Sequence, residues 1–175
     1  KKQLDDSKNA PTAASVDQNS PMEKRLLDWI QKTSIYTKYS DSFEIIPQFE
    51  LGKYLKSIDP GYQHPYYKVD FLIRLKDYGE VHQFIIEYDG FAYHFLEGEE
   101  VNSLNWRNYL TPEDVERECI LESYGYKMIR VNRFNMGKDP VSSLDQKLKD
   151  LIDEYVNVKK KSEQLPDSER RRQRA

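Results

Sequence analysis

The sequence predicts an α/β domain in which a small mixed sheet is flanked by helices, and three observations predict it. Residues 66–75 and 81–88 form a strongly apolar hairpin. Helix-start signals at Ser20 and Thr111 precede amphipathic segments, and the strand-like segment 126–132 follows the second of these. A chain of 175 residues is long enough for one domain with a sizeable core.

Both ends of the chain are too polar to belong to that core. Residues 1–19 mix charged, amide and small side chains without an apolar period, so we expect a disordered lead-in or linker. Residues 159–175 form a charged tail rich in lysine and arginine. The domain is therefore expected to span residues 20–158. A first residue that is lysine rather than methionine favours an excised fragment or processed product.

The first helix is predicted from residue 21 to about residue 32. Ser20 is the expected N-cap, a proline follows at the first helical position, and Glu23 completes a capping box. The segment 43–51 has the composition of a strand, and Pro47 argues for a sheet edge or a bulge. Turn signals dominate from there to residue 65.

The hairpin strands are predicted at about residues 66–75 and 81–88. Their connection, residues 76–80, is short enough for a hairpin turn, and Gly79 can supply a positive φ. Residues 90–110 are aromatic and acidic without a clear period. We interpret this segment as a loop that covers the site.

The second half continues as helix, strand and helix. Thr111 caps a helix expected over residues 112–124, and Gly125 occupies the position of a C-terminal cap. A strand over residues 126–132 and an amphipathic helix over residues 141–158 follow.

Charge and cysteine content limit the classes of function. The net charge is −3, and apart from the tail no clear basic face is evident, which argues against tight autonomous DNA binding and favours delivery of substrate by a larger assembly. Cys119 is the only cysteine, so we expect a reducing compartment, in the cytoplasm or nucleus. No run of about eighteen apolar residues occurs, and we expect a soluble protein without a membrane partner.

Acidic residues lie where a buried sheet should carry none. Asp70 interrupts one hairpin strand, Glu87 ends the next, and Asp89 follows two residues later. Burying such a carboxylate costs several kcal/mol unless a cation or hydrogen bonds compensate it. Along the first hairpin strand, alternation places Tyr67, Val69, Phe71 and Ile73 on one face and Lys68, Asp70 and Leu72 on the other. Along the second strand, it places Ile85, Glu87 and Asp89 on a common face. A hairpin would bring Asp70 near Glu87, and such an oxygen-rich site suits Mg²⁺ or Mn²⁺.

The order helix, three strands, helix, strand, with Asp on the second strand and Glu-x-Asp ending the third, resembles the PD-(D/E)XK nuclease superfamily. More narrowly, residues 20–134 resemble the very-short-patch-repair-like endonuclease domains that often terminate helicase-type proteins. The motifs that carry the resemblance are Ser20-Pro21-x-Glu23, Pro47-Gln48, Val69-Asp70-Phe71, Ile86-Glu87-Tyr88-Asp89-Gly90 with Tyr93-His94, Asp114-x-x-Arg117-x-x-x-Leu121-x-x-x-Gly125-Tyr126 and Ile129-Arg130-Val131. The resemblance implies a restriction-endonuclease-like core.

The resemblance also implies the site residues. Asp70 and Glu87 would be metal ligands, with the Tyr88 carbonyl as a third, and Glu23 and Gln48 would approach from the first helix and the first strand.

The superfamily lysine is absent from this chain, because Asp89 occupies its position. Two candidates for the water-activating group remain open: Lys68, placed by alternation on the face of Asp70, and Asp89 itself, as a base or second-metal ligand. Arg117 heads the apolar stripe of the second helix, where it could pair with a carboxylate of the site, bind a scissile phosphate or be exposed.

The expected function is a Mg²⁺-dependent endodeoxyribonuclease that acts on DNA with a helicase or within a repair or defence assembly. The alternatives are a nuclease-fold module that binds nucleic acid for a partner without efficient catalysis, and an RNase of the same fold. Simpler interpretations remain for single residues: Glu23 as a capping residue, Asp89 as part of a turn, and His94 as a packed loop residue. Several of the thirteen tyrosines could stack bases or line a half-buried surface.

Overall fold

The computed structural model describes residues 21–77, 80–97 and 100–163. Ser20, Gly79, the expected lead-in and residues 164–175 of the expected tail lie outside these residues. None of the helices in the described part is both long and apolar enough to cross a membrane.

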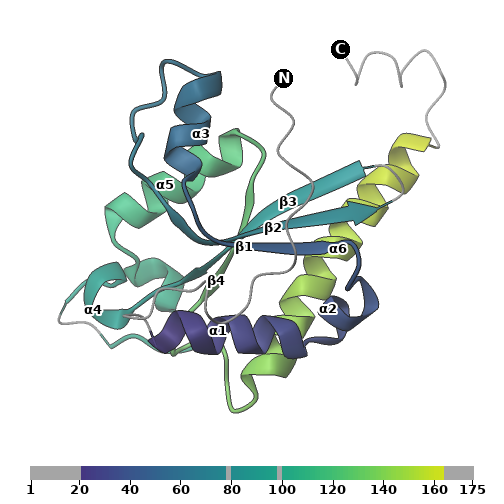
Figure 1. The fold of residues 1–175 in the computed structure, drawn as a ribbon. Coiled ribbons are helices and arrows are strands. Elements are labelled where there is room, and N and C mark those ends of the chain that lie inside the picture. Colours follow the sequence, from purple (N-terminus) through teal and green to yellow (C-terminus); the bar gives the residue numbers. More distant parts are fainter. Residues whose placement is uncertain (1–20, 78–79, 98–99, 164–175) are drawn as a thin grey trace.

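Four strands form one mixed sheet in the order β1-β2-β3-β4 (Figure 1). The strands are β1 (Phe43–Phe49), β2 (Val69–Asp77), β3 (Glu80–Tyr88) and β4 (Lys127–Val131). The first three are antiparallel neighbours, and β4 pairs in parallel with β3. The predicted hairpin is confirmed, and Pro47 lies on an edge strand, where its missing N–H costs least.

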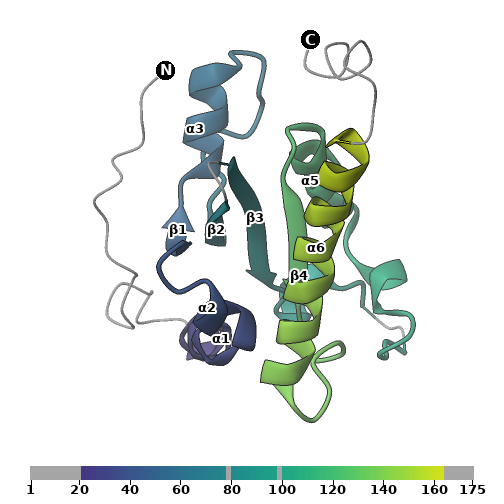
Figure 2. The same cartoon turned by 90° about the vertical axis from the view of Figure 1, so that its right-hand side faces the viewer.

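Helices cover both faces of this sheet. One face packs on α1 (Pro21–Lys32), α2 (Ser34–Lys38) and α6 (Pro140–Glu163), and the other packs on α3 (Leu51–Ile58) and α5 (Pro112–Ser123). Figure 2 shows α1 and α2 side by side, with α6 running along β4. The structure is thus an α/β fold with a small mixed sheet flanked by helices.

α5 begins at the Thr111 cap that the sequence predicts, whereas four further helical segments, α2, α3, α4 and η2, were not expected. α3 lies in the stretch interpreted as turns, because Gly52 lowers its helix propensity and its apolar stripe is short. The segment interpreted as a loop contains a helical turn, α4 (Phe91–His94), and a 3₁₀ turn, η2 (Trp106–Tyr109). Phe95 and Leu110 form an isolated bridge that closes it.

The predicted alternation along β2 fails at Asp70. Val69 was expected to share a face with Phe71, but Phe71 packs on the α1 and α6 side, whereas Val69 and Leu72 both pack on the α3 and α5 side. Tyr67 packs there as well, against the second core cluster. The neighbouring edge strand is also irregular, since Gln48 has φ +50°, a conformation that L residues rarely adopt.

Candidate active site

One end of the sheet gathers the polar residues. β2 is antiparallel to β3, and β4 is parallel to β3, so the start of β2 lies beside the ends of β3 and β4. The ladder between β2 and β3 stops at the pair Phe71 and Ile86. Beyond that pair β3 continues along β4, so β2 and β3 separate at Asp70 and Glu87.

Asp70 and Glu87 lie together at this fork. The Tyr88 backbone N–H donates to Asp70 Oδ2 at 2.8 Å, and the Asp70 backbone N–H donates to Glu87 Oε1 at 3.3 Å. The side chains of Glu87 and Glu23 lie near enough to the Asp70 carboxylate to influence its pKa, so the three acids form one coupled cluster.

Neighbouring side chains hold this cluster in place. The Tyr67 hydroxyl donates to Glu87 Oε1 at 3.0 Å, and Gln48 Nε2 donates to Glu23 Oε2 at 2.8 Å. The structure therefore brings Glu23 and Gln48, from α1 and β1, to the two acids of the hairpin. Tyr67 was not predicted as a site residue, because the alternation argument placed it on the opposite face from Asp70.

Burial makes the negative charges of the cluster costly. The pKa of Glu87 is raised well above its ordinary value by burial and then by the charge of Asp70. Burial also raises the pKa of Asp70, although the hydrogen bond from the Tyr88 N–H opposes this shift. Within the described residues neither Asp70 nor Glu87 forms an ion pair, so no fixed cation neutralises them.

Asp89 belongs to a separate, interior ion pair. It is 1% exposed, and Arg130 Nη1 lies 2.6 Å from its Oδ1. Arg130 also pairs with Glu118 at 3.3 Å and donates to the Asp114 backbone carbonyl at 3.1 Å. This arginine thus links the end of β3 to β4 and α5, and it already pairs with the Asp89 carboxylate.

His94 and Asp114 form a second polar pair beside the cluster. His94 Nδ1 lies 2.9 Å from Asp114 Oδ2, which also accepts the Thr111 hydroxyl at 2.7 Å. The bond to Asp114 raises the pKa of His94. Burial alone would raise the pKa of Asp114, but hydrogen bonds from His94 and Thr111 outweigh it and lower that pKa. His94 is also close enough for its charge to act on Asp70 and Asp89.

The sequence did not identify this pair as functional. The available signals were the Tyr93-His94 dipeptide and Asp114, both within the motifs of the resemblance. Neither indicated a pair, because the histidine gains its partner through the unpredicted turn α4.

Lys68 does not lie on the Asp70 face that strand alternation predicted for it, and Arg117 stacks on an aromatic ring rather than pairing with an acid of the hairpin. Lys68 precedes β2, is exposed and lines a hollow beside α3, so strand alternation cannot direct it toward Asp70. Arg117 is half-buried and places its guanidinium 4.3 Å from the centre of the Tyr67 ring. In the described part of the chain it pairs with neither Asp70 nor Glu87.

The donor chemistry of the cluster suits a hard divalent cation. Among residues 21–77, 80–97 and 100–163, no group of three or more His, Cys, Asp or Glu side chains is arranged to hold a metal ion. A site at the fork would therefore depend on Asp70 and Glu87 with a backbone carbonyl and waters. Mg²⁺ and Mn²⁺ accept such a set, because Mg²⁺ in particular keeps several waters when it binds carboxylates.

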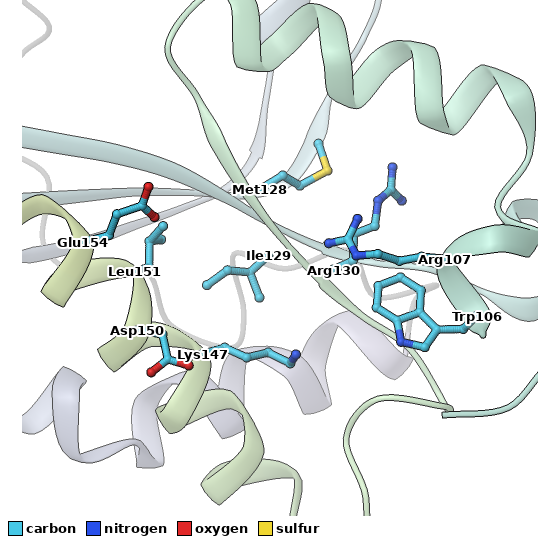
Figure 3. A pocket seen from close by; sticks show the side chains of 9 residues that line it. All are labelled: Trp106, Arg107, Met128, Ile129, Arg130, Lys147, Asp150, Leu151 and Glu154. Carbon is cyan, nitrogen blue, oxygen red and sulfur yellow. The ribbon is translucent and has the colours of Figure 1, made fainter. Parts of the chain in front are cut away.

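A separate hollow of about 260 Å³ lies along β4, between η2 and α6 (Figure 3). Its lining is Trp106, Arg107, Met128, Ile129, Arg130, Lys147, Asp150, Leu151 and Glu154. Asp70 and Glu87 do not contribute to it. Burial and the raised pKa values of Asp70 and Glu87 make the fork, rather than this hollow, the candidate site.

Comparisons with protein-family models, with curated proteins and with solved structures find no significant match to this chain. Geometry and chemistry of the fork therefore carry the functional argument.

Proposed function

We propose that this protein is a Mg²⁺- or Mn²⁺-dependent nuclease with a restriction-endonuclease-like core that hydrolyses phosphodiester bonds in DNA. One observation supports this most directly: Asp70 and Glu87 converge in a buried place without a cationic side chain between them. Two buried acids in contact favour either a shared proton or a divalent cation. Of these two, a bound divalent cation would give the pair of acids a role in catalysis.

Asp70, Glu87 and the Tyr88 carbonyl would hold the ion. A bound divalent cation would supply Lewis-acid polarisation of a phosphate oxygen and a lowered pKa for a water molecule. Tyr67 orients Glu87 by donating to its Oε1, and Gln48 holds Glu23 in the same way. These bonds reduce the reorganisation that the carboxylates need before they act.

His94 is the candidate for proton transfer or for a hydrogen bond to the phosphate. Its Nδ1 is held by Asp114, so its other ring nitrogen is the one free to face a substrate. Asp89 is less suited to a base role, because Arg130 already pairs with its carboxylate. Lys68 remains a candidate only if it turns from its exposed position toward the fork.

The test is a cleavage and metal-binding experiment on the purified chain. Wild type, Asp70→Ala and Glu87→Gln are incubated with Mn²⁺, with Mg²⁺ or with a chelator on single-stranded, double-stranded and branched DNA and on RNA. Calorimetry measures Mn²⁺ binding in parallel. Asp150→Asn, at an exposed position on α6, is the matched control.

We expect metal-dependent DNA cleavage and Mn²⁺ binding by wild type and the control, and the loss of both in the two site variants. Equal cleavage by Asp70→Ala would identify a contaminant and contradict the proposal. Absence of Mn²⁺ binding by wild type would also contradict the proposal. Preferential cleavage of RNA would favour the RNase alternative.

A nucleic-acid-binding module with little catalysis is the second candidate. The position of Asp89 favours it, because an acid tied to Arg130 stands where the superfamily has its lysine. Metal binding without cleavage would support this reading. In either case a helicase-type partner would be expected to deliver the strand, because the net charge of −3 gives the chain little general attraction for nucleic acid.

A further inference from the structure

We propose that an unpaired DNA strand crosses the acidic fork between two exposed tyrosines, Tyr66 and Tyr93, which stack bases on either side of it. This inference rests on the proposed function, since it names the form of the substrate for the same site. It goes beyond that function because neither the fork nor the resemblance distinguishes a single strand from a duplex.

The two tyrosines flank the site by topology. Tyr66 lies just before β2, and Tyr93 lies in α4, just after β3. Because β2 and β3 are antiparallel, the start of one and the end of the other lie at the same end of the sheet. Each tyrosine adjoins a site residue in the chain, since Tyr67 donates to Glu87 and His94 acts on Asp70.

Their exposure separates them from the other tyrosines. Among the tyrosines whose side chains the structure describes, Tyr66 is 94% exposed and Tyr93 is 84% exposed, while the next, Tyr54, reaches 36%. Most of the other tyrosines whose side chains the structure describes are half-buried or buried. Two rings that contribute little to the core remain beside the fork, and such rings are platforms on which bases stack.

Positive side chains accompany the first ring. Tyr66 borders a hollow of about 420 Å³ whose other lining residues are Glu50, Lys53, Lys56, Pro65 and Lys68. Lys53 lies 3.8 Å from Glu50, and Lys56 donates to the carbonyls of Pro60 and Tyr62. Lys68 forms no ion pair within the described residues. Three lysines against one glutamate give this hollow the charge that a phosphate backbone requires.

A cation also lies on the helical turn that carries the second ring. Tyr93 shares α4 with Phe91, and the Arg133 guanidinium lies 4.2 Å from the centre of the Phe91 ring. Phe91 is partly exposed, so this corner joins an aromatic surface to a positive charge. Each side of the fork thus combines an aromatic surface with positive charge, as proteins that bind single strands without sequence preference do.

These features favour a single strand over a duplex. A base can lie against a tyrosine face only when it is unstacked from its neighbours, which a paired helix does not allow. Duplex binding would also call for a broad basic face, whereas the cations that support this strand path are Lys53, Lys56 and Lys68 beside Tyr66 and Arg133 beside Phe91. A strand that presents a few phosphates and free bases matches both groups.

The experiment measures binding without catalysis. Fluorescence anisotropy follows a labelled twelve-nucleotide DNA strand, the same sequence as a duplex, and the RNA equivalent, all in chelator. The variants are Tyr66→Ala, Tyr93→Ala and Lys68→Ala. Leu104→Ala, at an apolar position that is 95% exposed, and Lys149→Ala, on α6, are the matched controls.

We expect each tyrosine variant to lose about tenfold or more in affinity for the single strand. Lys68→Ala should weaken binding and reduce its salt dependence by about one phosphate contact. The controls should bind as wild type does. No binding by wild type, an equal or stronger preference for duplex, or tyrosine variants that bind normally would each overturn the inference.

The outcome is separable from that of the nuclease proposal. Strand binding that depends on Tyr66 and Tyr93, in a protein that neither binds Mn²⁺ nor cleaves, would support the strand path and refute the nuclease. Metal-dependent cleavage that is unchanged in both tyrosine variants would support the nuclease and refute the strand path. Tighter binding of the RNA strand than of the DNA strand would overturn the proposal that the bound strand is DNA.

Discussion

Asp70 and Glu87 exchange hydrogen bonds with each other's strands: the carboxylate of Asp70 accepts the N–H that follows Glu87, and the carboxylate of Glu87 accepts the N–H of Asp70. The two acids therefore replace ladder bonds where β2 and β3 part. This satisfies backbone donors that would otherwise lose their partners. It leaves both acids without an ion-pair partner among the described residues.

Glu87→Gln is expected to stabilise the metal-free protein. Glutamine keeps an oxygen acceptor for Tyr67 and for the Asp70 N–H, and it removes the repulsion between two buried charges. At pH 7 we expect a gain of about 1–3 kcal/mol in the free energy of unfolding. Urea denaturation in chelator measures it. Added Mn²⁺ should stabilise wild type and leave the variant nearly unchanged.

The pH dependence of this gain follows from the direction of the shift. The folded-state pKa of Glu87 lies above its unfolded value of about 4.3, so wild type loses stability as pH rises from there through the folded pKa. The difference between variant and wild type should therefore be small near pH 4 and grow with pH. A variant that is less stable than wild type at pH 7, with no such trend, would refute the account.

The sequence predicts the hairpin and the acids well, because an apolar run with carboxylates at its end leaves few other arrangements. The break in alternation at Asp70 could not be predicted, since it depends on bonds between side chains and the backbone of a neighbouring strand. Gly52 weakens the helix signal of the α3 segment, so α3 could not be predicted from the sequence. The contact between His94 and Asp114 depends on how α4 packs. Periodicity reports local structure, whereas these features depend on contacts between segments.

Arg130→Met should be among the most destabilising substitutions in the chain. It leaves the buried carboxylate of Asp89 without its cation, and losing one partner of such a pair costs about 3–5 kcal/mol. Denaturant unfolding provides the measurement. Adding Asp89→Asn to this variant should recover part of the loss, because the orphaned charge is removed.

The matched control for that substitution is Lys127→Met on the same strand. Lys127 is exposed and pairs with Glu154 at 3.5 Å, so its loss should change the unfolding free energy by less than about 1 kcal/mol. Similar costs for Arg130→Met and Lys127→Met would show that the interior pair contributes no more than a surface one.

His94 should titrate above its ordinary pKa of about 6.5, and Asp114→Asn should bring that pKa down. NMR of the imidazole resonances follows both, with Asp150→Asn as control. The raised pKa of His94 contributes stability below pH 6.5 that is lost as pH rises through the folded value, while the lowered pKa of Asp114 contributes stability above about pH 4. Asp114→Asn should thus cost most stability between these limits. A cost that is equal at pH 5.5 and pH 9 would contradict this.

Gly52→Ala tests how α3 supports the fork. The Gly52 N–H donates to the Tyr67 carbonyl at 2.9 Å, and an added methyl group would meet the backbone of residues 64–67, with the Tyr67 nitrogen only 2.7 Å away. Backbone cannot yield as a flexible side chain does, so α3 or that segment must move, at a cost of about 3 kcal/mol. Thermal unfolding measures the cost, and Ser57→Ala, at an exposed position of the same helix, is the control.

The same substitution should act on the acids at a distance. Moving residues 64–67 displaces the Tyr67 hydroxyl from Glu87 Oε1, which removes a hydrogen bond that favours the charged carboxylate. The pKa of Glu87 should therefore rise further, and Mn²⁺ affinity measured by calorimetry on the folded variant should fall. Tyr67→Phe should reproduce the loss of affinity without the steric cost. Weakened binding in Gly52→Ala alone would show that α3 reaches the site by a route other than Tyr67.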